Sequence, residues 1–174
     1  MEIVEFLLGE KLIINNASML AANPGTYYNL GWHRDVIQIP ENAIRDELFS
    51  KKRHHNSCQI NLALYDEDFL QVVAASHNRP NTSGENKAFA GTKHYAPLDA
   101  NMPGAEKVLI KAGSALFYNN NLIHRGYCEK IENPRRTLHM GFHSATRKPT
   151  WHFYLLNPDT VSEDDVQRLD PTLK

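Results

Sequence analysis

Short apolar runs separated by turn-forming residues dominate the hydrophobic pattern of the chain. An alternating run spans residues 60–65 and ends at Asp66-Glu67-Asp68, and a second run spans 70–75 and ends at Ser76-His77-Asn78. Similar runs lie at 12–14, where Asn15-Asn16 follow, and at 108–110, 115–118, 137–142 and 151–156. Runs of this length with such punctuation are typical of strands in a sandwich or barrel. The pattern therefore predicts a mainly β protein of the double-sheet jelly-roll type with few helices.

Two long polar stretches, at 40–56 and 78–107, interrupt the predicted strands. Loops of that length usually carry function, so we expect both stretches to cover the sheets as loops or lids and to determine selectivity. One helix is predicted close to the C-terminus, because Ser162 suits an N-cap and the acidic residues 163–165 suit a first helical turn. No repeat and no linker divides the 174 residues, which predicts a single domain over 1–174.

Composition and charge narrow the classes of function. The 19 Lys and Arg against 20 Asp and Glu give a formal net charge of -1, and hence no electrostatic reason to expect a nucleic acid or an anionic membrane as partner. No apolar stretch approaches the roughly 20 residues that span a bilayer. Cys58 and Cys128 alone form no disulfide framework, so we expect a reducing, cytoplasmic location. The oligomeric state stays open.

The first candidate for chemistry is Trp32-His33-Arg34-Asp35. Residues i and i+2 of a strand project from the same face, so His33 and Asp35 are placed to reach one metal ion while Arg34 turns away. An imidazole nitrogen and a carboxylate oxygen are two of the three ligands in the facial triad that holds non-haem Fe(II). With nine histidines in the chain, about one such pair is expected by chance, so the pair alone also fits a surface strand.

A second segment adds a histidine and an arginine in an order that suits a keto-acid cosubstrate. A glycine turn and a predicted strand precede His124, and Arg135 follows eleven residues later, where another predicted strand opens. A keto acid that chelates iron leaves its far carboxylate about 5 Å away, where a buried arginine meets it with a charged, planar fork. Taken singly, His124 also fits a buried structural histidine, and Arg135 a surface cation.

Together these blocks resemble the phytanoyl-CoA hydroxylase-like family of oxygenases. The blocks are His33-Arg34-Asp35, the run 59–64 leading to Ala75-Ser76-His77, the run 113–117, and His124-Arg125-Gly126 followed by Arg135-Arg136, in the same order over roughly residues 10–145. The resemblance implies a double-stranded β-helix of cupin-like jelly-roll form. It also implies His33, Asp35 and His124 as iron ligands and Arg135 as the residue that binds the far carboxylate of 2-oxoglutarate.

The chain departs from the family pattern in three ways. Only 32 residues precede the His-x-Asp block, where the family usually has several helices and strands. We therefore expect a chain without the usual N-terminal region, or a minimal version with one sheet face poorly covered. Gly126 stands where some members carry a serine that helps to bind the cosubstrate. Arg136 is a second candidate for the cosubstrate arginine, although Arg135 shares its strand face with Thr137 and His139, and that polar parity favours Arg135.

Polar residues on one further predicted strand are candidates for the same pocket. Gln59 and Asn61 project from one strand face, and we expect them to bind the near carboxylate of 2-oxoglutarate or the substrate. Outward-facing polar positions on an alternating strand account for them equally well.

The sequence is therefore interpreted as an Fe(II)- and 2-oxoglutarate-dependent dioxygenase that uses O2 to hydroxylate a small organic substrate. Related halogenases carry a small residue in place of the carboxylate ligand, so the presence of Asp35 favours hydroxylation. Two alternatives remain, namely a metal-binding jelly-roll protein without 2-oxoglutarate chemistry and a non-catalytic binding module. Arg135 argues against the first alternative, because a metal site without 2-oxoglutarate gives the charge of this arginine no role.

Overall fold

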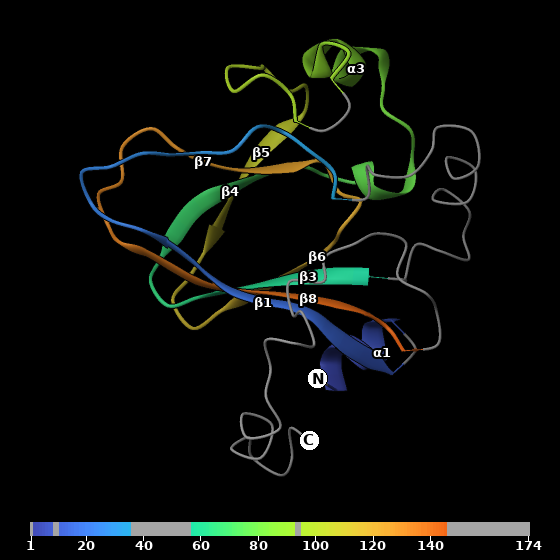
Figure 1. Cartoon of the computed structure of the whole chain (residues 1–174), viewed down its shortest axis with the longest axis vertical. Helices are drawn as coiled ribbons and strands as arrows, with labels where there is room; N and C mark the ends of the chain where they lie inside the picture. Colours follow the sequence, from blue (N-terminus) through green and yellow to red (C-terminus); the bar gives the residue numbers. More distant parts are fainter. Residues whose placement is uncertain (1, 9–10, 36–56, 93–94, 146–174) are drawn as a thin grey trace, which may run out of the picture.

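Two four-stranded antiparallel sheets face each other across the interior of the molecule (Figure 1). The computed structural model describes residues 2–8, 11–35, 57–92 and 95–145. One sheet has the strand order β1-β8-β3-β6, and the other has the order β2-β7-β4-β5. This is a double-stranded β-helix of the cupin-like jelly-roll type, so the fold class predicted from the short apolar runs is confirmed.

The first sheet consists of β1 (Leu12–Ala22), β3 (Ser57–Ala63), β6 (Ala115–Asn119) and β8 (Arg135–Ser144). Strand β8 pairs with β1 on one side and with β3 on the other. The register of β1 shifts between Ile14 and Asn16, which marks a β-bulge. The predicted end of this strand at residue 14 is therefore wrong, because the bulge leaves out only Asn15 and the pairing resumes with Asn16 opposite Gly141.

The second sheet consists of β2 (Tyr28–Asn29), β4 (Glu67–Val73), β5 (Ala105–Ile110) and β7 (His124–Cys128). Strand β4 begins three residues before the predicted run, inside the acidic triplet that we interpreted as a turn. Cross-strand hydrogen bonds set the ends of a strand, and Glu67 pairs with Ile110. A strand can therefore begin at a polar residue, and the apolar pattern of the sequence does not show where it begins.

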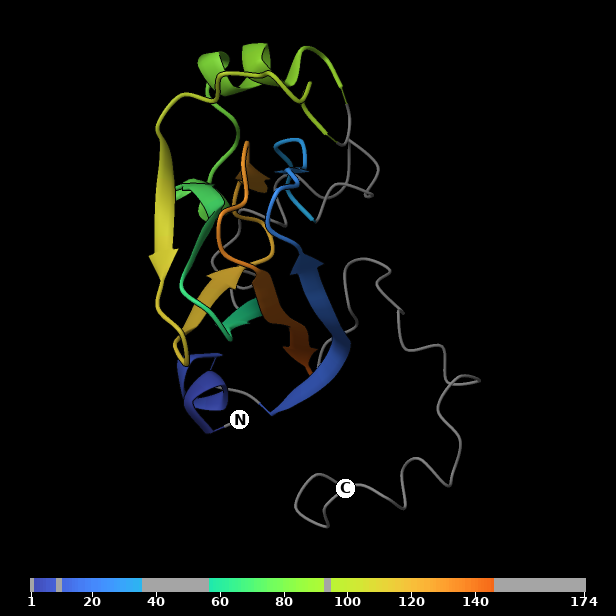
Figure 2. The same cartoon turned by 90° about the vertical axis from the view of Figure 1, so that its left-hand side faces the viewer.

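In the described ranges, three short helical segments accompany the sheets: α1 (Glu2–Leu8), η1 (Ser76–Asn78) and α3 (Ser83–Phe89). Helix α3 and the start of β5 lie inside the stretch 78–107, so its prediction as one long loop is wrong. The helix begins at a reciprocal capping box between Thr82 and Glu85, which satisfies two backbone N–H groups that would otherwise lack partners. Helices α1 and α3 lie at opposite ends of the molecule (Figure 2).

Three expected elements, the stretch 40–56, the strand at 151–156 and the helix after Ser162, lie outside the described residues. In the described ranges, no helix combines the length and the apolar character that crossing a membrane requires.

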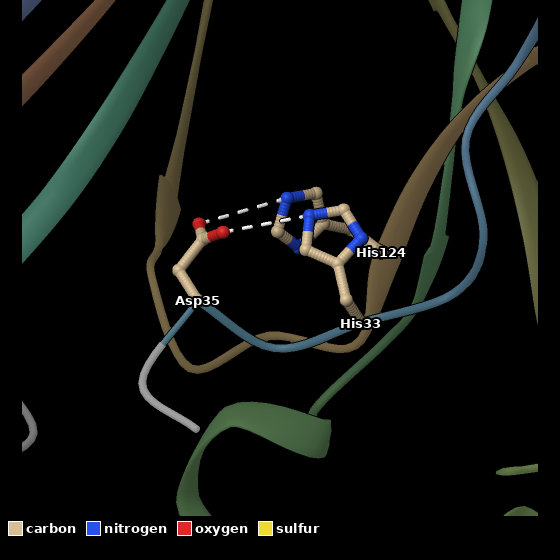
Figure 3. A group of neighbouring side chains, drawn as sticks. All are labelled: His33, Asp35 and His124. Carbon is tan, nitrogen blue, oxygen red and sulfur yellow. Dashed lines mark ion pairs between the residues drawn. The ribbon is translucent and has the colours of Figure 1, made fainter. Parts of the chain in front are cut away.

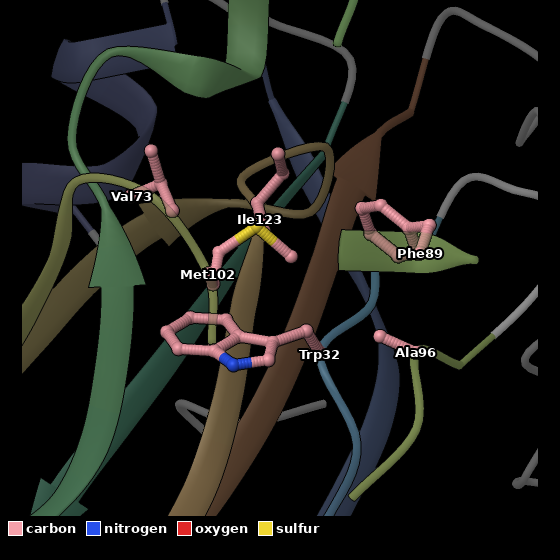
Figure 4. Packing of buried hydrophobic residues seen from close by; sticks show 6 residues of the cluster. All are labelled: Trp32, Val73, Phe89, Ala96, Met102 and Ile123. Carbon is pink, nitrogen blue, oxygen red and sulfur yellow. The ribbon is translucent and has the colours of Figure 1, made fainter. Parts of the chain in front are cut away.

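The hydrophobic cluster below α3 fixes the chain just ahead of two candidate ligands. It contains Trp32, Val73, Phe89, Ala96, Met102 and Ile123 (Figure 4). Trp32 directly precedes His33 and is 1% exposed, and Ile123 directly precedes His124 and is fully buried. Close packing leaves such side chains little freedom to shift, so this cluster holds the backbone of both histidines in place.

Two more hydrophobic clusters lie among the described residues. One lies below α1 on the outer face of the first sheet and contains Val4, Leu12, Cys58, Ile60 and Phe142. The other contains Leu70, Tyr118 and Leu122, and Leu70 and Tyr118 also line the cavity between the sheets.

Candidate metal centre

Backbone pairing brings His33 and His124 together. The N–H of each residue donates to the carbonyl oxygen of the other at 3.0 Å, as an isolated antiparallel bridge. Asp35 lies in the turn that follows, and its N–H donates to the carbonyl oxygen of Asn120 at 3.0 Å. The expected regular strand through His33 and Asp35 is therefore absent, and a single bridge and a turn place the two residues instead.

The three side chains converge on one point (Figure 3). Asp35 Oδ1 lies 3.4 Å from His33 Nε2, and Asp35 Oδ2 lies 3.7 Å from His124 Nε2. Each side chain is at most 9% exposed, and the candidate ligand atoms all lie within 4.8 Å of one another. Two imidazole nitrogens and a carboxylate oxygen at these separations form the donor set of a facial triad.

Main-chain carbonyl groups orient both imidazole rings. Nδ1 of His33 lies 2.8 Å from the carbonyl oxygen of Gly31, and Nδ1 of His124 lies 2.9 Å from that of Leu122. A carbonyl oxygen only accepts, so Nδ1 carries the proton in both rings and Nε2 keeps its lone pair. Both lone pairs are thereby directed toward the carboxylate of Asp35, as metal ligation requires.

Electrostatics keep His124 and Asp35 in the protonation states that bind a metal. Burial and the neighbouring His33 lower the pKa of His124 to about 4. Burial tends to raise the pKa of Asp35, but the adjacent His124 and His33 outweigh it and hold that pKa below its ordinary value. A neutral imidazole beside a carboxylate suits a divalent cation, because no proton need leave His124 before the metal binds.

Gln59 and Asn61 both face the cavity, from the strand predicted to carry them. Gln59 is 5% exposed, and its Nε2 donates to Asp35 Oδ2 at 2.6 Å. Asn61 Oδ1 lies 2.7 Å from Nδ1 of His139. The structure thus places Gln59 against a candidate ligand and Asn61 against a cavity-lining histidine, while their binding to a keto acid or a substrate stays a prediction.

Arg135 and Arg136 have different surroundings. Arg135 is 1% exposed and lines, with His33, Asp35 and His124, a cavity of about 230 Å³. Its Nη1 has no hydrogen-bond partner among the described residues. Arg136 instead donates to the carbonyl oxygen of Ala22 and to the side chain of Asn23 at the rim of the sheet. Strand parity therefore directs Arg135 inward, as the polar residues on its face predict.

The glycine at position 126 leaves room for an aromatic ring. A Cβ atom there would lie 2.5 Å from Cε1 of Tyr28 and 3.4 Å from Nη1 of Arg135. Tyr28 thus occupies the space that the side chain of a serine would need, and its ring centroid lies 4.7 Å from Cζ of Arg135. The departure from the family pattern at this position is accompanied by a ring stacked on the arginine.

Several residues that line the cavity or contact a lining residue were not singled out from the sequence. Tyr95 lines the cavity opening, with its ring centroid 4.8 Å from that of His33. Asn120 is 1% exposed, and neither polar atom of its side chain has a partner among the described residues. Glu67 contacts Arg135. The asparagine run 119–121 was a visible signal, whereas nothing in the acidic triplet distinguishes Glu67 from its neighbours.

No family profile matches the chain, and no curated protein matches it. Among solved structures, HygX from Streptomyces hygroscopicus with nickel and 2-oxoglutarate bound has a TM-score of 0.65 at 16% identity, covering 87% of this chain and 63% of HygX. The non-haem α-ketoglutarate-dependent epimerase SnoN from nogalamycin biosynthesis has a TM-score of 0.58 at 18% identity, covering 93% and 60%. The non-haem monooxygenase ThoJ has a TM-score of 0.61 at 17% identity, covering 86% and 53%.

These likenesses show the fold that the chain shares with non-haem iron enzymes of the oxygenase and epimerase types. The chain spans less than two thirds of the length of each of the three proteins. The finer resemblance to the phytanoyl-CoA hydroxylase-like family stays a prediction. At this level of identity, the conclusion that the comparisons support is a shared double-stranded β-helix.

Proposed function

We propose that this protein is an Fe(II)- and 2-oxoglutarate-dependent dioxygenase that hydroxylates a small organic substrate. One observation carries the proposal: a buried two-histidine, one-carboxylate group shares a single cavity with a buried arginine whose Nη1 is unpaired within the described part of the chain. The triad leaves three coordination positions open, and an arginine fork suits a carboxylate. The cofactors bound in HygX and SnoN agree with this assignment.

The residues present fit both groups. His33, Asp35 and His124 would hold Fe(II) through two imidazole nitrogens and a carboxylate. Arg135 would bind the far carboxylate of 2-oxoglutarate, because an unpaired guanidinium N–H that is buried demands an acceptor. Fe(II) with 2-oxoglutarate and O2 would supply the oxidising chemistry.

The side chains of the protein orient the metal ligand Asp35 and the cosubstrate arginine Arg135. The Nε2 of Gln59 holds one carboxylate oxygen of Asp35, and the rings of Tyr28 and Phe69 lie within 5.0 Å of the Arg135 guanidinium. Tyr95 is 49% exposed where it lines the cavity, which puts its ring at the opening beside His33. A substrate that enters there would meet this aromatic ring before it reaches the metal centre.

The test is 2-oxoglutarate turnover by the purified chain with Fe(II), ascorbate and O2, measured as succinate formed. We expect succinate from the wild type, and much less from Arg135→Ala when 2-oxoglutarate is near the dissociation constant of the wild type. An Fe(II)-binding protein that forms no succinate and gives no visible iron–keto-acid absorption band would be a metal-binding jelly roll without this chemistry. A protein that does not bind Fe(II) at all would be a non-catalytic binding module.

A further inference from the structure

A buried glutamate contacts the arginine that the proposed function gives to 2-oxoglutarate. Glu67 opens β4 and is 4% exposed, and its Oε2 accepts a hydrogen bond from Arg135 Nε at 3.0 Å. The same oxygen accepts a hydrogen bond from the hydroxyl of Thr137. Both side chains of the ion pair are 2% exposed, so water screens their charges little.

The pair leaves part of the guanidinium available to the cavity. An arginine has five N–H donors, and the hydrogen bond to Glu67 uses the Nε–H. Nη1 has no acceptor within the described ranges, although it is buried. The guanidinium lies over two rings, with Cζ 4.7 Å from the centroid of Tyr28 and 5.0 Å from that of Phe69. Its plane is therefore fixed, with Glu67 at one edge.

A second carboxylate at the free N–H groups would approach the same cation as Glu67 does. The two anions would then repel each other across one guanidinium, and burial strengthens that repulsion because the effective dielectric constant is low. Without its glutamate, however, Arg135 would be an unpaired buried charge in the ligand-free protein, which is strongly destabilising. Glu67 thus stabilises the empty site and opposes its occupation.

We propose that Glu67 is a resident counter-ion of Arg135 that competes with the far carboxylate of 2-oxoglutarate and so sets the affinity for the cosubstrate. This inference rests on the proposed function, since it concerns the arginine assigned to 2-oxoglutarate there. Glu67 is in this sense a positioning residue, because it acts on the cosubstrate through Arg135.

The test is Glu67→Gln in the full chain. Glutamine keeps an oxygen that accepts from Arg135 Nε, and it removes the charge. Fe(II)-loaded protein without O2 is titrated with 2-oxoglutarate, following the visible iron–keto-acid band. We expect the dissociation constant to fall at least about five-fold relative to the wild type, because the like-charge repulsion is gone. Chloride should also compete with 2-oxoglutarate more strongly in the variant, because the uncompensated guanidinium accepts any small anion.

Thermal unfolding is the second readout. Glu67→Gln should have a lower Tm than the wild type in ligand-free buffer, and 2-oxoglutarate should raise it by a larger increment than it raises the wild-type Tm. If the variant does not fold without ligand, adding 2-oxoglutarate should restore folding, since the dicarboxylate supplies the missing anion. Failure of that rescue would contradict the proposal.

The matched control is Glu85→Gln, which also removes a buried glutamate from an arginine pair. Glu85 is 2% exposed and bonds to Arg79 through both oxygens, outside the cavity. We expect this variant to have a lower Tm than the wild type and to keep the wild-type affinity for 2-oxoglutarate. Binding by Glu67→Gln that is equal to or weaker than that of the wild type would overturn the proposal. If the wild-type protein shows no iron–keto-acid band at all, that result would instead contradict the proposed function.

Discussion

Gln59 Nε2 lies 2.6 Å from Oδ2 of Asp35, and this hydrogen bond crosses from the first sheet to the turn that carries the carboxylate. Asp35 follows a single bridge position and has no ladder of its own to fix its side chain. The amide of Gln59 supplies that restraint, because it holds one oxygen while both imidazoles face the carboxylate. Residues that orient a metal ligand in this way often matter nearly as much as the ligand.

Removing the Gln59 amide should loosen the metal centre without unfolding the protein. Gln59→Leu is expected to lower the affinity for Fe(II) roughly 10- to 100-fold, the usual effect of losing a group that orients a ligand. A competition titration with a chelator measures it, and circular dichroism checks the fold. Gln71→Leu is the control, since Gln71 pairs with Arg125 and does not line the cavity. Equal affinities for the two variants would show that Gln59 does not orient Asp35.

Loss of the carboxylate ligand should have a larger effect. Asp35→Ala is expected to lower Fe(II) affinity by more than roughly 100-fold, because a ligand counts for more than the group that orients it. Substrate hydroxylation should disappear, while circular dichroism stays like that of the wild type. Asp99→Ala removes an exposed carboxylate and should bind Fe(II) normally. An Asp35→Ala protein that binds Fe(II) as the wild type does would exclude Asp35 as a ligand.

Arg135→Lys should not behave as a conservative change. Lysine keeps the charge but loses the planar two-point fork and the donor that meets Glu67. For Arg135→Ala, truncating one partner of a buried charge pair costs about 2–5 kcal/mol, so the dissociation constant of 2-oxoglutarate should rise roughly 30-fold or more. Arg136→Ala and Arg136→Lys should change it little. If the Arg136 variants weaken the iron–keto-acid band and the Arg135 variants do not, the assignment is wrong by one residue.

Adding a single methyl group at position 126 should disturb the cosubstrate end of the cavity. The new Cβ of Gly126→Ala would meet Tyr28 at 2.5 Å, and overpacking of this kind costs about 1–3 kcal/mol of unfolding free energy. Tyr28→Ala removes the obstacle, so the same glycine substitution should cost less in that background. Urea unfolding of the four proteins in this cycle measures the coupling. Additive losses would mean that the ring already moves freely.

The two cysteines should react differently with a thiol reagent. Burial raises the pKa of Cys58 to about 11, so its reactive thiolate is scarce at pH 8 and its Sγ is shielded. Cys128 is partly exposed on β7. A native-state titration should therefore count one fast thiol, and unfolding should release the second. Fast reaction of Cys58 in the native state, checked with Cys128→Ser, would indicate that the cluster below α1 opens.

The sequence alone predicts the fold class and the convergence of the candidate ligands. Short apolar runs reflect strands with one buried face, and that physical requirement survives errors of a few residues in each boundary. His33, Asp35 and His124 lie together in the structure, as the order of the blocks along the sequence predicts. The strand parity of Arg135 also follows from the sequence, since alternate side chains must face opposite sides of a sheet.

Other features depend on contacts that a linear pattern does not contain. Glu67 in β4 is paired with Arg135 in β8, which is distant in sequence, and only the folded structure reveals this ion pair. Helix α3 was missed although its capping box is visible as Thr82-x-x-Glu85, because a polar helix of seven residues shows little periodicity. The prediction of a regular strand through Asp35 was wrong for a related reason. One backbone bridge and the packing of Trp32 position this segment, and the linear pattern shows neither contact.

The bridge between His33 and His124 has a consequence for how the protein folds and stays folded. It joins two segments that are separated in the sequence by β3, β4, β5 and β6, so the entropy of closing a long loop opposes the bridge in the unfolded chain. The unfolded chain therefore holds His124 far from His33 and Asp35 and offers Fe(II) no comparable site. A ligand that binds only the native state stabilises it by about 2.7 kcal/mol at one hundred times its dissociation constant. The supply of free Fe(II) would thus set part of the lifetime of the folded chain against unfolding and proteolysis.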